Sequence, residues 1–104
     1  MRSAIYCRFS AEMQSPRSIA DQERECRAFA ARQGWDVVLV RSDEAVRAGA
    51  TAGRTGYQAL LEAAKRREFD ALLVEEVSRF SRDFLGGIAQ LAELHTLGVR
   101  LADT

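Results

Sequence analysis

The stretch that decides the fold lies at the front of the chain, where residues 3–10 read SAIYCRFS. Its small and apolar residues predict a β-strand over 3–9. Successive side chains of a strand point to opposite faces, so Tyr6, Arg8 and Ser10 project to one side of this segment. A hydroxyl with an arginine beside it at a strand end is a candidate nucleophile for an anionic substrate.

Helix and strand patterns alternate along the rest of the chain. The helix predicted over 18–33 has Ser18 as its N-cap, Asp21 at its third position and Gly34 past its end. The further elements are a strand at 35–40, a polar loop at 41–54, helices at 55–67 and 81–97, and strands at 69–77, with its core at 71–74, and 99–102. This order predicts an α/β fold in which residues 1–104 form a single domain, with a mostly parallel central sheet and helices on both faces.

Each predicted helix has a stripe of residues that should face the sheet. The stripes consist of Ile19, Gln22, Cys26, Phe29 and Ala30; of Tyr57, Leu60, Leu61 and Ala64; and of Phe84, Leu85, Ile88, Leu91 and Ala92. The strand at 35–40 is rich in valine, and we expect it to be buried on both faces.

The composition describes an ordinary globular domain, with 47% hydrophobic residues, 29% charged residues and a formal net charge of +0 at pH 7. No apolar run or signal-peptide pattern suggests a membrane, so we expect a cytoplasmic protein without a membrane partner. The neutral balance argues against DNA binding by bulk charge, and any DNA contact should be local. Cys7 and Cys26 are expected to be reduced core thiols.

Three connections should meet at the carboxyl edge of the sheet, where open α/β sheets bind their ligands. They are 9–18, 41–54 and 78–82, and they supply Ser10 with Arg8, Arg54, and Arg79 with Arg82. Arg79 and Arg82 are three residues apart at a helix start, so both can face one point beside free backbone donors. Because a guanidinium group binds two phosphate oxygens and stays charged, the pattern predicts a phosphate site around Ser10.

Other interpretations stay open at this point. Any single arginine could be a solvated or ion-paired residue, and Ser10 could simply cap a turn. Carboxylates near the same edge could orient the arginines, or could bind magnesium in a metal-dependent nuclease. These carboxylates are Asp43, Glu44, Glu75 and Glu76. The sequence contains no nucleotide-binding glycine fingerprint and no G-x-S-x-G motif, and His95 is interpreted as a packing or boundary residue of the last helix.

Taken together, the motifs resemble the catalytic domain of the serine site-specific recombinases, the group that includes resolvases, invertases and large serine recombinases. They occur in the family's order and span nearly the whole chain. The matching residues are Tyr6-Cys7-Arg8-Phe9-Ser10, Gln14, Ser18, Gln22, Gly53-Arg54 and Ser78-Arg79-Phe80-Ser81-Arg82.

The resemblance implies a resolvase-like fold and a role for each of these residues. Ser10 would attack a DNA phosphodiester and form a 5′-phosphoserine linkage, with release of a 3′-hydroxyl. No metal or nucleotide cofactor is implied, and the partners would be double-stranded DNA and further copies of the protein, as a homodimer that assembles into a synaptic tetramer. The residues that would stabilise charge are Arg8, Arg54, Arg79 and Arg82, and those that would position the site are Gln14 and Gln22.

This chain departs from the family pattern in two respects. Many members have an aspartate immediately before the first arginine of the R-x-x-R element, where this chain has Ser78. A role of that carboxylate could pass to Glu76, or the domain could be a catalytically silent DNA-associated oligomerisation module. Family members also continue into a long pairing helix and DNA-binding domains, so we expect the chain to be a fragment that is inactive by itself.

Overall fold

The computed structural model describes residues 1–10, 18–45, 55–75 and 87–104. Strands and helices alternate within these ranges, as predicted. The elements are β1 (Arg2–Ser10), α1 (Ile19–Gln33), β2 (Asp36–Ala45), α2 (Thr55–Lys65), β3 (Ala71–Val74), α4 (Gly87–Thr96) and β4 (Arg100–Asp103). Within the same ranges, no helix has the length and apolar character needed to cross a membrane.

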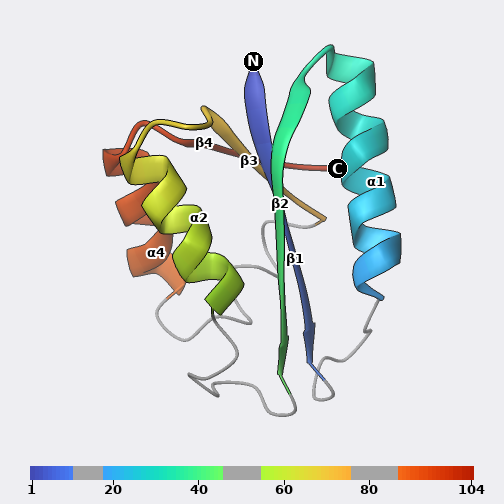
Figure 1. Cartoon of the computed structure of the whole chain (residues 1–104), viewed down its shortest axis with the longest axis horizontal. Coiled ribbons are helices and arrows are strands. Elements are labelled where there is room, and N and C mark those ends of the chain that lie inside the picture. Colours follow the sequence, from blue (N-terminus) through green and yellow to red (C-terminus); the bar gives the residue numbers. More distant parts are fainter. Residues whose placement is uncertain (11–17, 46–54, 76–86) are drawn as a thin grey trace.

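The four strands of the described chain form one sheet in the order β2-β1-β3-β4, and each neighbouring pair is parallel. α1 covers one face of this sheet, and α2 and α4 cover the other (Figure 1). Parallel neighbours require a crossover connection, and helices on the faces provide it. The predicted α/β class, with helices on both faces of a parallel sheet, is confirmed.

Two apolar clusters, one on each face of the sheet, hold the layers together. β1 contributes to both, because Ala4 and Tyr6 pack toward α2 and α4 whereas Ile5 and Cys7 pack toward α1. β3 is buried along its whole length, which confirms the prediction that 71–74 forms the core of a strand. The central pair β1 and β3 therefore anchors both layers of helices.

α1 begins and ends where the sequence predicts. The Ser18 hydroxyl accepts a hydrogen bond from the backbone N–H of Asp21 at 3.0 Å, and Gly34 has a φ of 73°. A side chain is strained at such a positive φ, so glycine suits the residue after the helix. The predicted stripe is confirmed by the burial of Gln22, Cys26 and Ala30 and by the partial burial of Ile19 and Phe29.

β2 departs from the prediction in two ways. It is the edge strand of the sheet and is not buried on both faces, since Val38 is 48% exposed. It also continues to Ala45, through the first five residues of the segment predicted as a loop, because these residues pair with β1 from Tyr6 to Ser10. Backbone pairing keeps this polar segment extended without any apolar pattern of side chains.

The remaining helices agree with the sequence in part. The stripe predicted for α2 is confirmed, since Tyr57, Leu60, Leu61 and Ala64 are all buried. In α4 the prediction is wrong at Ala92, which is exposed, whereas Leu94 is 1% exposed. His95 is exposed and does not pack in the core. Phe84 and Leu85 lie outside the described residues.

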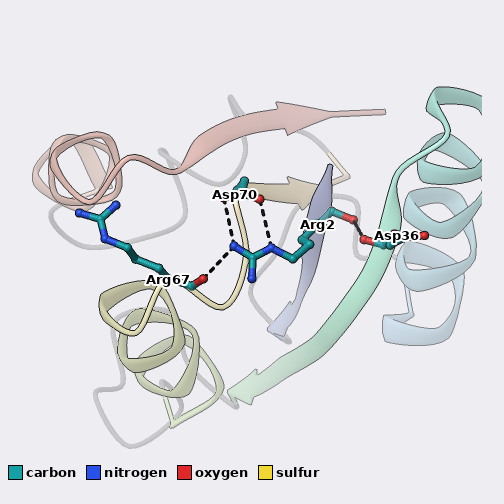
Figure 2. A network of polar contacts seen from close by, with 5 residues as sticks. Arg2, Asp36, Arg67 and Asp70 are labelled. Carbon is teal, nitrogen blue, oxygen red and sulfur yellow. Dashed lines mark hydrogen bonds and ion pairs between the residues drawn. The ribbon is translucent and has the colours of Figure 1, made fainter.

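Polar contacts fasten the edge of the sheet at which the strands begin. Figure 2 shows the Arg2 guanidinium group between Asp70, which precedes β3, and Arg67, which follows α2. Arg2 Nε donates to Asp70 Oδ2 at 3.3 Å, and Arg2 Nη2 donates to the Arg67 carbonyl oxygen at 2.9 Å. Because the Arg2 and Asp70 side chains are about half exposed, the ion pair contributes at most about 1 kcal/mol.

The opposite edge of the sheet, where the site was predicted, is stepped. β1 pairs with β3 only as far as Ile5 and Leu73, one residue before β3 ends. β1 and β2 stay paired up to Ser10 and Ala45. At about 3.3 Å per residue, β1 therefore extends about 13 Å beyond β3. Figure 1 shows β1 continuing past the end of β3. Among the residues that the structure describes, β2 is the strand that pairs with the part of β1 carrying Arg8.

Cys7 and Cys26 are buried core thiols, as predicted. Both are free and 0% exposed, and both belong to the apolar cluster between the sheet and α1. Burial is the main cause that raises the pKa of each thiol from 9.0 to about 12, and nearby negative charge adds to it.

We predict that neither thiol reacts readily with an aromatic disulfide reagent in the folded protein at about pH 8, because the thiolate is the reactive form. The released chromophore, followed by absorbance, should show no fast phase in native buffer and two reactive thiols after unfolding in denaturant. Labelling of either cysteine in native buffer at the rate of an exposed thiol would contradict this assignment.

Candidate functional site

The structure describes part of the site that the sequence predicts. Arg8 and the backbone of Ser10 lie in the overhanging part of β1, and Gln22 lies in the first half of α1. The other predicted members lie outside the described residues and remain predictions; they are Gln14, Arg54, Arg79 and Arg82.

Arg8 is a buried charged residue, with an exposed fraction of 7%. Strand alternation places it on the same face as Tyr6, toward α2 and α4. Its neighbour on β2 is Asp43, which is 4% exposed. Burial of a charge is unfavourable unless polar or charged groups compensate it. Arg8 is therefore not a solvated arginine of a strand end.

Gln22 holds the backbone of Arg8 through both ends of its side-chain amide. Gln22 Nε2 donates to the Arg8 carbonyl oxygen at 2.8 Å, and the Arg8 N–H donates to Gln22 Oε1 at 3.1 Å. Gln22 is 5% exposed, so both hydrogen bonds are shielded from water. α1 is thus joined to β1 by a polar clamp as well as by apolar packing.

This clamp lies on the side of β1 that faces β3, beyond the last described pair between the two strands. The Arg2 carbonyl oxygen points toward β3, because it accepts a hydrogen bond from the N–H of Asp70 at 2.9 Å. Backbone groups along a strand alternate between its two sides, so those of Arg8 point to the same side, at a level that β3 does not reach. An amide side chain has the donor and the acceptor of a peptide group. Gln22 therefore gives the backbone of Arg8 the two hydrogen bonds that a neighbouring strand would give.

Three hydrogen bonds to Asp43 in the site region were missed by sequence reasoning. The Tyr6 hydroxyl donates to Asp43 Oδ2 at 2.7 Å. The backbone N–H of Gly56 donates to Asp43 Oδ1 at 2.7 Å, and that of Tyr57 donates to Oδ2 at 3.0 Å. Both amides belong to the first turn of α2, where N–H groups have no partner inside the helix. No local sequence pattern indicates this contact, because the acceptor lies on a different element, 13 residues before Gly56.

These contacts bear on the magnesium hypothesis. Two oxygens of Asp43 already accept three hydrogen bonds, and such a donor environment suits an anion and leaves little room for a cation. Among the residues that the structure describes, no three His, Cys, Asp or Glu side chains come together in a group that could hold a metal ion. The side chains of Glu44 and Glu76 are not among those described.

The end of β1, which carries Arg8 and Ser10 in its sequence, is held from two sides. β2 supports β1 as far as Ser10, and Gln22 supports it from the other side at Arg8. Preorganised groups lose little freedom when they meet a substrate. Arginine is well suited to oxyanions, and its planar fork can donate two hydrogen bonds to one phosphate group.

Comparison with known proteins gives a consistent result. A model of the resolvase N-terminal domain matches residues 3–104. The chain is similar to the C-terminal catalytic domain of ISC1926 TnpA, an IS607-like serine recombinase, with 26% sequence identity and a TM-score of 0.81 over 99% of this chain and 70% of that one.

Two further solved structures share the fold at lower identity. The N-terminal catalytic domain of TP901-1 integrase is 24% identical, with a TM-score of 0.75 over 99% of this chain and 76% of that one. A resolvase family site-specific recombinase from Streptococcus pneumoniae is 22% identical, with a TM-score of 0.74 over 99% of this chain and 71% of that one. The motif-based resemblance and the fold therefore point to the same group of proteins.

We predict that Gln22→Met lowers the free energy of unfolding by about 2–3 kcal/mol, because methionine fills similar space but leaves the N–H and C=O of Arg8 without these partners. Equilibrium urea unfolding measures the change. Gln33→Met is the matched control, since Gln33 is an exposed residue of the same helix. Equal effects of the two substitutions would show that the clamp contributes nothing.

Proposed function

Because this chain belongs to the resolvase family of serine recombinases, through a match over residues 3–104, we propose that it cleaves and rejoins double-stranded DNA at specific sites with Ser10 as the nucleophile. The observation that carries the proposal is the braced end of β1. The buried Arg8 lies two residues before Ser10, on backbone that β2 and Gln22 hold from opposite sides.

In the proposed step, the hydroxyl oxygen of Ser10 attacks a phosphorus atom of the DNA backbone. A bond forms between this oxygen and the phosphorus, and the bond from the phosphorus to the 3′ oxygen breaks, which leaves the 5′ phosphate on the protein. The serine loses its proton, and the departing 3′ oxygen gains one. Rejoining reverses these events with the 3′-hydroxyl of another strand end. Since one phosphodiester replaces another, the step requires no nucleotide cofactor.

Arginine side chains are proposed to stabilise the negative charge that builds up around the phosphorus. A preorganised positive group acts strongly in a site from which water is excluded, and loss of one such donor lowers a rate by about 100-fold to 1000-fold. Arg8 is the described member of this set, and its burial strengthens its field. Arg54, Arg79 and Arg82 complete the proposed set and would supply the charge that metal ions supply in other phosphoryl-transfer enzymes.

The glutamines are proposed to act on the position of these groups. Gln22 fixes the backbone of Arg8 through the two hydrogen bonds described above. Gln14 follows Ser10 by four residues and is assigned to the positioning of the intervening segment. Neither amide carries a charge, so both would affect geometry more than the field at the phosphorus.

The proposed partners are double-stranded DNA and further copies of the protein. Exchange between two duplexes breaks four strands, and one copy supplies a single Ser10. A homodimer on each site, with two dimers joined in a synaptic tetramer, would provide the required nucleophiles. The formal net charge of +0 implies that affinity for DNA comes from local contacts and not from bulk attraction.

We predict that the protein at full length, incubated with DNA that carries its recombination site, forms a covalent complex that survives SDS and leaves a free 3′-hydroxyl. Ser10→Ala should abolish this complex on a denaturing gel, because alanine has no nucleophilic oxygen. Ser42→Ala, a change of an exposed serine on β2, should leave it unchanged.

Equal amounts of covalent complex from wild type and Ser10→Ala would show that the nucleophile assignment is wrong. A wild-type protein that binds DNA and oligomerises without ever cleaving would favour the alternative, a catalytically silent DNA-associated oligomerisation module. Ser78, which stands where many family members have an aspartate, is the sequence feature that favours this alternative.

A further inference from the structure

We propose that Arg32 and Arg100 form a second contact surface for DNA, at the edge of the sheet where the strands begin and on the face that α1 covers. The ligand is the phosphate backbone of duplex DNA, bound without regard to its sequence. The proposal rests on the proposed function for the identity of the anion, because that function makes DNA the partner. The surface is remote from Ser10 and has no part in the cleavage step.

The first observation is a row of four side chains that combines two arginines with two aromatic rings. The guanidinium carbon of Arg32 lies 5.9 Å from the centre of the Phe29 ring. The guanidinium carbon of Arg100 lies 5.9 Å from the centre of the Trp35 ring. The two rings meet edge to face, with their centroids 5.7 Å apart. A guanidinium group at such a distance is attracted by the π electrons of the ring. We call these four residues the arginine–aromatic row.

The row is assembled from elements that lie far apart in the sequence. Arg32 belongs to the last turn of α1, Trp35 directly precedes β2, and Arg100 is the first residue of β4. The start of β4 is fixed beside the start of β3, because the N–H of Arg100 donates to the carbonyl oxygen of Asp70 at 3.0 Å. Strand alternation places Arg100 on the face of Ala102, which packs in the cluster beneath α1. The fold thus brings both guanidinium groups to one face of the sheet.

The second observation is that the charges of these two arginines are not balanced by a carboxylate. Arg32 and Arg100 are exposed. Among the residues that the structure describes, neither guanidinium group forms an ion pair. Four other exposed arginines of the described chain each have a carboxylate partner, namely Arg2, Arg24, Arg27 and Arg66. The arginines of the row are therefore available to an external anion.

The chemistry of the row matches a phosphate backbone. Contact with a ring leaves a guanidinium group its N–H donors, which can bind two oxygens of one phosphate group. The ring also limits the movement of the arginine side chain, so less freedom is lost on binding. Contacts to phosphate groups carry no sequence information directly. Since the formal net charge is +0, attraction to DNA depends on local positive charge of this kind.

The row lies at the opposite edge of the sheet from the proposed nucleophile. Arg100 pairs with Ala71 at the start of β3, whereas Ser10 is the last residue of β1. At about 3.3 Å per residue, β1 spans about 26 Å from its first residue to its last. DNA on the row is therefore held away from the cleaved phosphodiester. Loss of the row should change affinity for DNA and not the chemical step.

The double variant Arg32→Gln, Arg100→Gln tests the surface, and its fold should persist because both residues are exposed. The matched control is Arg24→Gln, Arg27→Gln, which removes the same charge from two exposed arginines of α1 that have carboxylate partners. A short DNA duplex without a recombination site is titrated into the 104-residue chain at several salt concentrations. The readouts are the emission of Trp35, the single tryptophan of the chain, and the salt dependence of the association constant.

We expect the duplex to change the emission of Trp35 in the wild-type chain, because phosphate groups bind beside the guanidinium partner of this ring. Each phosphate contact adds about 1 to the slope of log association constant against log salt concentration, so Arg32→Gln, Arg100→Gln should lower this slope by about 2. Between about 50 and 200 mM salt, the wild-type chain should then lose about 10-fold more affinity than the variant. The control should keep the wild-type slope.

An equal loss of slope in the two double variants would overturn the proposal, because it would show an effect of bulk charge alone. Binding of the duplex without any change in Trp35 emission would also overturn it, since the DNA would then lie elsewhere. Self-association of the wild-type chain without DNA, measured by sedimentation and abolished by Arg32→Gln, Arg100→Gln, would assign the row to a second copy instead.

The titration involves no cleavage, so it can fail independently of the proposed function. A wild-type protein that gives a covalent complex in the test above, with equal salt slopes in the two double variants, would refute the surface and leave the function intact. A wild-type protein that gives no covalent complex, with the expected change of slope, would refute the function and support the surface.

Discussion

The candidate site depends on a constraint of backbone hydrogen bonding: β1 continues past the end of β3, yet its buried N–H and C=O groups still need partners. Gln22 meets this need at Arg8 by offering the donor and the acceptor of a peptide group. Gln22 thereby supports the strand that carries Arg8 and Ser10 on the side away from β2. The backbone two residues before the proposed nucleophile is thus tied to α1.

The described chain is held together differently at its centre and at its stepped edge. Apolar clusters on the two faces of the sheet fix α1 and α2 in place over β1 and β3. Nearer the site, hydrogen bonds of single polar side chains connect the elements. Gln22 joins α1 to β1, and Asp43, which lies on β2, joins that strand to α2 and β1. Apolar packing tolerates small shifts, whereas a buried hydrogen bond fixes distance and direction. This division places the stricter geometry where phosphoryl transfer would require it.

Sequence reasoning recovered the elements whose signals are local. Ser18 and Gly34 marked the ends of α1, and the resemblance indicated that Gln22 has a positioning role. The second half of β2 was missed because pairing with β1, and no apolar pattern, keeps it extended, and the exposure of Val38 follows from a strand order that the sequence does not state. The partners of Asp43 were missed because they lie on other elements. The placement of Arg54, Arg79 and Arg82 stays a prediction, since the described residues do not include them.

The central claim, that Ser10 becomes linked to the 5′ phosphate of cleaved DNA, is tested most directly by mass spectrometry of the trapped protein–DNA complex. After digestion with a protease and a nuclease, we expect the mass of the attached nucleotide on the peptide that contains Ser10, and fragmentation of that peptide should place the phosphate on this residue. A phosphate found on a different side chain, or a complex without any covalent nucleotide, would contradict the claim.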